Sequence, residues 1–165
     1  MAKEKQDHVD RILAQWRRER PDLDVEPMGI LGRLKRLGTH LGREVEVVLL
    51  KHGLSTSAFD VLATLRRSGA PHRLSPGELL EMTMVSSGTM TNRIDQLEKA
   101  GFVQRILNPE DRRSVLIALT DKGFATVEEA VDAHAANQQR LTANLSAADK
   151  AELDRLLKKF LSDFE

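Results

Sequence analysis

The chain has 165 residues, of which 41% are hydrophobic, 30% are charged and 4% are aromatic. Lysine plus arginine and aspartate plus glutamate number 25 each, and this zero formal net charge argues against a protein that coats nucleic acid without selectivity. The absence of cysteine excludes a disulfide framework, a thiolate zinc site and a thiol-based redox sensor.

The N-terminal part predicts one amphipathic helix over Gln6–Arg20, which Pro21 ends. Its apolar side carries Val9, Ile12, Leu13 and Trp16. The residues in front of this helix lack the apolar core of a signal peptide, and no apolar run in the sequence is long enough to span a bilayer. We therefore expect a cytoplasmic protein with no membrane partner.

Two further helices are predicted, over about Met28–Lys51 and over Ser55–Arg67. The first contains glycines that weaken an isolated helix, so packing must hold it together. Close approach of helices at a dimer interface is one reason for them. These glycines are Gly29, Gly32, Gly38 and Gly42. The second helix has an apolar side suited to a scaffold role, and Gly69–Pro71 ends it.

A short helix then begins at Ser75. This serine, Pro76 and Glu78 supply a cap hydroxyl, a proline at the first helical position and a carboxylate at the third. We expect this helix to end near Met84.

A second amphipathic helix begins after Ser86, a candidate cap, and ends at Gly101. Its apolar residues, Met90, Ile94 and Leu97, recur at i, i+4 and i+7. The other side carries small and polar residues, which let the backbone approach DNA and bond to base edges or phosphates, and Arg93 borders the apolar side. This side consists of Ser87, Gly88, Thr89, Thr91, Asn92 and Gln96.

Two β-strands follow, over Phe102–Leu107 and Ser114–Leu119. The turn between them contains Arg112 and Arg113, which can lie along the DNA backbone or enter the minor groove. Two short helices with a tight link also occur in many proteins that do not bind DNA. The order of helices, hairpin and arginine tip nevertheless favours a winged helix-turn-helix. The fold class predicted is mainly α (α+β), with a helical dimerisation region.

The C-terminal third predicts helices over Asp121–Leu141 and Ser146–Phe160, and the start of the second resembles a cap, Ser146, followed by an acidic first turn with Asp149. The last helix carries a continuous apolar stripe, which needs a partner. The chain's own N-terminal helix would serve, but a second subunit satisfies the stripe better. We therefore expect a homodimer, in which residues 1–54 and 121–165 form the dimerisation region and residues 55–120 form the DNA-binding lobe. The stripe consists of Leu153, Leu156, Leu157, Phe160 and Leu161.

Three segments resemble the MarR family of bacterial transcriptional regulators: Ser86–Val103, Asp111–Arg113 and Ala118–Gly123. The resemblance extends from about Met28 to Phe160. It implies a homodimer with two winged lobes that binds a pseudo-palindromic operator in double-stranded DNA. The DNA-binding residues that we predict are Ser86, Ser87, Thr89, Thr91, Asn92, Arg93, Arg112 and Arg113.

A narrower resemblance is to the urate-responsive subgroup of that family. It rests on the added N-terminal helix with Trp16, on Asp60 within Phe59–Leu62, and on Arg93 and Arg105. It implies that these four residues line a ligand pocket between the dimerisation region and the DNA-binding lobe. An anionic purine would stack on the indole, pair with an arginine and repel Asp60, so that ligand and DNA favour different conformers.

Each of these residues also has a simpler interpretation. Trp16 can pack in the core, and Asp60 can be solvated along a polar stripe of its helix. Arg93 can contact phosphate, and Arg105 can be an ordinary outward-facing charge on its strand. The ligand can equally be a related purine or a phenolic anion.

An enzyme is the rival class of function. The histidines have no metal-ligand spacing, no serine lies in a nucleophile elbow and no glycine-rich loop cradles phosphate. The five histidines are His8, His40, His52, His72 and His134. We expect no catalytic residue, metal or cofactor. A winged helix used only for protein contact is the second rival, and it would lack an affinity for duplex DNA that falls with salt.

Overall fold

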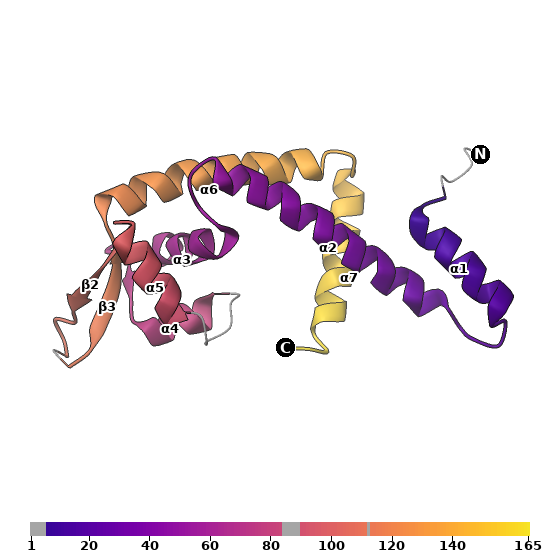
Figure 1. The fold of residues 1–165 in the computed structure, drawn as a ribbon, viewed down its shortest axis with the longest axis horizontal. Coiled ribbons are helices and arrows are strands. Elements are labelled where there is room, and N and C mark those ends of the chain that lie inside the picture. The colour runs from indigo at the N-terminus through magenta and orange to yellow at the C-terminus, as the bar shows by residue number, and fades with distance from the viewer. Residues whose placement is uncertain (1–5, 84–89, 112) are drawn as a thin grey trace. The chain divides into compact units, whose positions relative to one another are not determined.

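The computed structural model describes residues 6–83, 90–111 and 113–165. They divide into two compact units, Met1–Glu44 and Val45–Glu165. The elements are α1 (His8–Glu19), α2 (Glu26–Leu50), α3 (Thr56–Arg67), β1 (Arg73–Leu74), α4 (Pro76–Met82), α5 (Met90–Lys99), β2 (Val103–Leu107), β3 (Val115–Leu119), α6 (Asp121–Leu141) and α7 (Ala147–Leu161) (Figure 1). The predicted mainly helical fold with a small sheet is confirmed. No helix in the described residues is long and apolar enough to cross a membrane.

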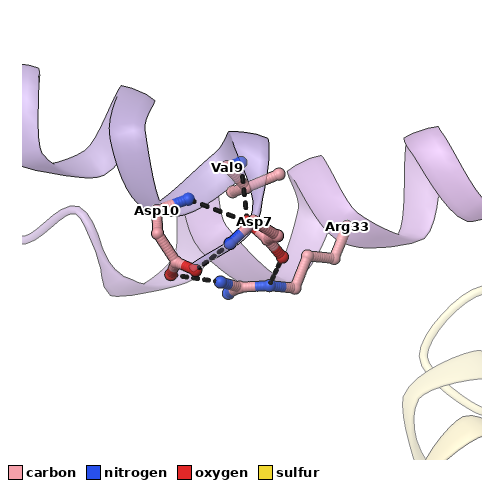
Figure 2. Close-up of polar contacts among 4 residues, drawn as sticks. All are labelled: Asp7, Val9, Asp10 and Arg33. Atoms are coloured by element: carbon pink, nitrogen blue, oxygen red, sulfur yellow. Dashed lines mark hydrogen bonds and ion pairs between the residues drawn. The ribbon is translucent and has the colours of Figure 1, made fainter. Parts of the chain in front are cut away.

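In the first unit, α1 packs on the N-terminal part of α2 around buried Val9, Leu13 and Val25. Asp7 caps α1 by accepting hydrogen bonds from the backbone N–H groups of Val9, at 2.7 Å, and Asp10, at 2.9 Å. Arg33 of α2 donates to both carboxylates, at 2.8 Å to Asp7 and 2.5 Å to Asp10 (Figure 2). These bonds, above all the one from Arg33, lower the pKa of the Asp7 carboxyl to about 2.

Two of the α2 glycines are explained within the chain. A Cβ atom at Gly29 would lie 3.0 Å from Leu13 Cδ1, and one at Gly32 would lie 3.4 Å from Val9 Cγ1. These glycines therefore let α1 approach α2 closely. The dimer interface proposed from the sequence is not needed to explain them. Gly38 and Gly42 face open space in the single chain.

In the second unit, a three-stranded antiparallel sheet of order β1-β3-β2 lies beside α3 to α6 (Figure 1). The predicted hairpin is present, with Val103 opposite Leu119 and Leu107 opposite Val115. β1 adds a third strand that the sequence analysis missed. The core that joins the sheet to the helices consists of Leu49, Leu54, Val61, Leu62, Leu65, Leu79, Met90, Ile94, Leu97, Val103, Ile117, Val127 and Ala130.

The start of α6 closes the junction between α5 and β2. Thr120 caps α6 by accepting the N–H of Gly123 at 3.0 Å, and its hydroxyl donates to the carbonyl of Gly101 at 2.7 Å. Lys122 donates to the carbonyl of Ala100 at 2.6 Å. Gly101 has a φ of 75°, which suits glycine at this turn. The short link from α5 to β2 is therefore held at its base.

The C-terminal helix α7 begins at Ala147, after Ser146, which caps it as predicted and forms a complete capping box with Asp149. Among the described residues of the single chain, none in α7 is buried. The predicted apolar stripe is exposed, with Leu156 at 47% and Leu161 at 50%.

Candidate nucleic-acid interface

The helix-turn-helix begins with α4, which is fixed at both ends. Ser75 and Glu78 form the predicted capping box, with hydrogen bonds of 3.2 Å to the serine hydroxyl and 2.8 Å to the carboxylate. The hydrogen bond from the Ser75 backbone is the main reason that the pKa of the Glu78 carboxyl is lowered. At the other end, the Arg67 guanidinium of α3 donates to the carbonyl of Met82 at 2.5 Å.

The predicted recognition helix corresponds to α5, which buries Met90, Ile94 and Leu97. Thr91 and Asn92 are exposed on its other side, and Arg93 is half-buried at the border. The exposed hydroxyl and amide can donate to and accept from base edges. The remaining predicted contacts of this helix and its cap, Ser86, Ser87 and Thr89, lie outside the described residues.

The wing is the β2–β3 hairpin, which lies beside α5 (Figure 1). Its loop is closed by side chains. Asp111 accepts the N–H of Arg113 at 3.0 Å, and Asn108 donates from its amide to Ser114 Oγ at 3.0 Å. The Arg113 side chain is exposed, so a cation is available at the tip for a phosphate. Arg112 lies outside the described residues.

Arg105 of β2 turns toward α5 and pairs with carboxylates there. Its guanidinium contacts Asp95 at 2.5 Å and also contacts Glu98. The hydrogen bond with Asp95 is the main reason that the pKa of the Arg105 guanidinium is raised. Arg105 is therefore paired with two carboxylates of α5.

Arg93 lines a cavity of about 260 Å³ between α5 and the start of α3. Among the described residues, its Nη1 atom is buried and has no hydrogen-bond partner. Ser55, Ser57 and Phe102 also line the cavity. Asp60 is half-buried on α3 and is not among the described lining residues. A buried guanidinium nitrogen without a partner favours binding of an anion.

Trp16 lies on α1 in the first unit and is 42% exposed. It lines an apolar cavity of about 250 Å³ between α1 and α2, and Lys35 and Arg36 lie on the same lining. An indole beside two cations suits an aromatic anion. The four-residue ligand set stays a prediction.

The sequence analysis did not single out Asp95 and Glu98. Their spacing was a usable signal, because carboxylates three residues apart on a helix share one face. It also missed Ser55 and Ser57 as cavity residues. No group of metal-ligating side chains occurs among the residues that the structure describes.

The comparisons with known proteins agree with this geometry. The model of the MarR family matches residues 54–115, which span α3 to the start of β3. The HTH-type transcriptional regulator PecS of Dickeya dadantii is 44% identical over 90% of each chain. The multiple antibiotic resistance protein MarR of Escherichia coli is 36% identical over 66% of this chain and 74% of its own.

Among solved structures, a MarR mutant from E. coli in complex with operator DNA superposes with a TM-score of 0.71. It is 32% identical, and the match covers 83% of this chain and 97% of that one. AbsC, a MarR family regulator from Streptomyces coelicolor, has a TM-score of 0.75 at 26% identity, over 86% of this chain and 95% of its own. PecS and AbsC are both named as transcriptional regulators. From the extent of these matches and the winged helix-turn-helix in the structure, the chain belongs to the MarR family of transcriptional regulators.

Proposed function

We propose that this protein is a cytoplasmic repressor that binds a pseudo-palindromic operator as a homodimer and releases it when a small anion binds. The observation that carries the DNA-binding part is the exposed polar side of α5 beside the wing. Thr91 and Asn92 are exposed on the helix, and Arg113 is exposed at the hairpin tip. This arrangement would put base-reading groups in the major groove and a cation on the flanking backbone.

The homodimer is supported by α7. Its apolar stripe is exposed in the single chain, with each of its five residues at least 40% exposed. A large apolar surface of this kind is typical of a subunit interface. A two-fold dimer would present two copies of α5 to half-sites about one helical turn of DNA apart.

The release by an anion is supported by Arg93. Its buried Nη1 atom, without a partner among the described residues, lies at the cavity beside the N-terminus of α3. The cavity of about 260 Å³ suits a small ligand rather than a large one. Urate is the ligand that the resemblance implies, and a related purine or a phenolic anion is the alternative.

A gel-shift titration tests this proposal. The probe is the duplex immediately upstream of the gene for this protein, at two salt concentrations, alone and with urate or salicylate. We expect tight, salt-sensitive binding that urate relieves. Relief by salicylate alone would reassign the ligand to a phenolic anion. Binding that ignores both would contradict the anion-release part, and no binding to this or any selected duplex would contradict the repressor itself.

A further inference from the structure

Three contacts join Arg105 of the wing to the recognition helix. The guanidinium contacts Asp95 Oδ1 at 2.5 Å through Nη2, and it contacts Glu98 Oε2 through Nη1. The backbone N–H of Arg105 donates to the other oxygen of Glu98 at 3.1 Å. Glu98 therefore holds both the backbone and the side chain of the same strand residue.

The backbone geometry aims these groups at one another. Side chains alternate along a strand, so Arg105 shares the inner face of β2 with buried Val103. Asp95 and Glu98 lie one turn apart on α5, on the side that faces this strand. The side chains of Arg105, Asp95 and Glu98 are 35%, 47% and 37% exposed, so the pairs are screened by solvent and each one is weak by itself.

The position of these pairs matters more than their strength. The link between α5 and β2 turns at Gly101, where Thr120 and Lys122 hold the chain. Contacts close to this turn, about which α5 would rotate, resist that rotation poorly. Asp95 lies six residues before Gly101, about 9 Å along the helix axis at the usual rise per residue, so a contact there resists tilting of α5 against the wing.

We propose that Arg105 is a positioning residue for DNA recognition: it clamps α5 to β2 and so fixes the angle between the recognition helix and the wing. This inference rests on the proposed DNA-binding function. It gives Arg105 a role that involves both the recognition helix and the wing, without direct contact to DNA or ligand.

The local charge argues against a direct contact of Arg105 with an anion. One guanidinium faces two carboxylates, so the cluster carries a formal charge of −1, which repels phosphate and anionic ligands. Arg93 differs, because its buried Nη1 has no partner among the described residues. The two arginines that the resemblance groups together therefore have different roles.

The test uses the full-length protein and a duplex that the wild type selects from a random library. The variants are R105Q, D95N, E98Q and the charge exchange R105E/E98R. We expect R105Q to weaken binding roughly three- to tenfold, and the two carboxylate variants to weaken it less. The slope of log affinity against log salt should stay unchanged, because no phosphate contact is lost. The charge exchange should recover most of the affinity.

R66Q is the matched control. Arg66 of α3 forms an ion pair of the same kind, at 2.6 Å from Glu128, so its partner lies on α6 and not on α5. R66Q should lower the melting temperature about as much as R105Q does. The operator affinity of folded R66Q should stay within about twofold of that of the wild type.

Several results would overturn the clamp. A salt slope that falls by about one in R105Q would make Arg105 a phosphate contact. Unchanged affinity in R105Q, or a charge exchange that binds no better than R105Q, would also contradict it. A wild type that selects no duplex would overturn the proposed function and this inference together, which separates that failure from failure of the clamp alone.

Discussion

Among the glycines of the described residues, Gly123, in the first turn of α6, leaves the least room for a Cβ atom. A Cβ atom there would lie 1.9 Å from the carbonyl oxygen of Phe102 and 2.8 Å from its carbonyl carbon. Both atoms belong to the backbone, so no side chain can turn away to make room. The contact sets how closely α6 approaches the start of β2.

We therefore expect Gly123→Ala to destabilise the protein by about 3 kcal/mol, through overpacking of backbone against backbone. Gly77→Ala is the matched control, because outside the backbone of α4 a Cβ atom at that position meets, among the described residues, only Ser75 Oγ, at 3.9 Å. Because alanine has a greater helix propensity than glycine, Gly77→Ala should leave the free energy of unfolding unchanged or raise it by up to about 1 kcal/mol. Urea unfolding followed by circular dichroism measures both, and equal effects of the two substitutions would contradict the close contact.

Substitutions of Asn92 and Arg113 should separate the reading of bases from binding to the DNA backbone. Asn92 is exposed on the outer side of α5, whereas Arg113 is exposed at the tip of the wing. Asn92→Ala should change the preferred bases at one position of each half-site, by about 1 to 3 kcal/mol of discrimination. Arg113→Ala should weaken binding to all duplexes and reduce the salt slope by about one.

Selection of operators from random duplexes, repeated with each variant, measures these changes. A uniform loss over all sequences for Asn92→Ala would count against base reading by this residue. An unaltered salt slope for Arg113→Ala would remove the wing tip from the phosphate contacts.

At the scale of elements, the anchoring of α1 depends on one carboxylate that serves two purposes. Asp7 caps α1 and also pairs with Arg33 of α2 (Figure 2). The pKa of its carboxyl is lowered from 3.8 to about 2, so the ionised form favours the packed helix. This contribution is present above about pH 4 and is lost as the pH falls through about 2.

Fluorescence of Trp16, the only tryptophan, reports on α1 directly. We expect an acid transition of this signal between about pH 4 and 2 in the wild type. Asp7→Asn should remove most of that transition and lower the thermal stability of α1 at pH 7. As a control, Asp22→Asn removes a carboxylate that pairs with Arg20 just after the end of α1, and it should leave the transition in place. A wild-type signal that is flat down to pH 2 would contradict the anchoring role.

The sequence predicts elements well where their signals are local. Ser75 and Ser146 were expected to cap helices, and both do so in complete capping boxes. Such caps involve residues three positions apart, which a single sequence displays. Small shifts occur elsewhere: the helix expected from Met28 begins at Glu26, because Pro27 is tolerated in a first turn.

Non-local contacts were not predictable in the same way. β1 has only two residues, and its pairing partners, Ala118 and Ile117, are more than 40 positions along the chain. The roles of Gly29 and Gly32 likewise depend on α1, from which a linker separates them. At the candidate site, residue types and the exposure of Asn92 followed from helical spacing. The pairing of Arg105 with α5 was not predictable, because it depends on the angle between β2 and the helix.

At the scale of the whole molecule, the even charge balance implies that DNA affinity arises locally. Lysine plus arginine equal aspartate plus glutamate, so attraction to DNA has to come from the placement of a few cations. A single DNA-binding lobe offers few such cations. Two lobes held in a dimer bind two half-sites at once, which raises the overall affinity well above that of either lobe.

Disruption of the α7 stripe should therefore abolish operator binding without damage to the DNA-binding lobe. Leu157 is 43% exposed in the single chain and lies within the stripe, so Leu157→Glu places a charge in the expected interface but not in the core. Ala148→Glu adds the same charge nine residues earlier, about two and a half turns along the helix and so on its opposite side, and serves as the control. We expect Leu157→Glu to raise the dimer dissociation constant by at least about tenfold, measured by analytical ultracentrifugation, and to weaken operator binding in parallel. The melting of the lobe should stay close to that of the wild type, because α7 adds no buried residue to its core. A variant that remains dimeric, or a monomer that binds the operator as tightly as the wild type, would show that α7 does not create the two-fold arrangement on which recognition of a palindrome depends.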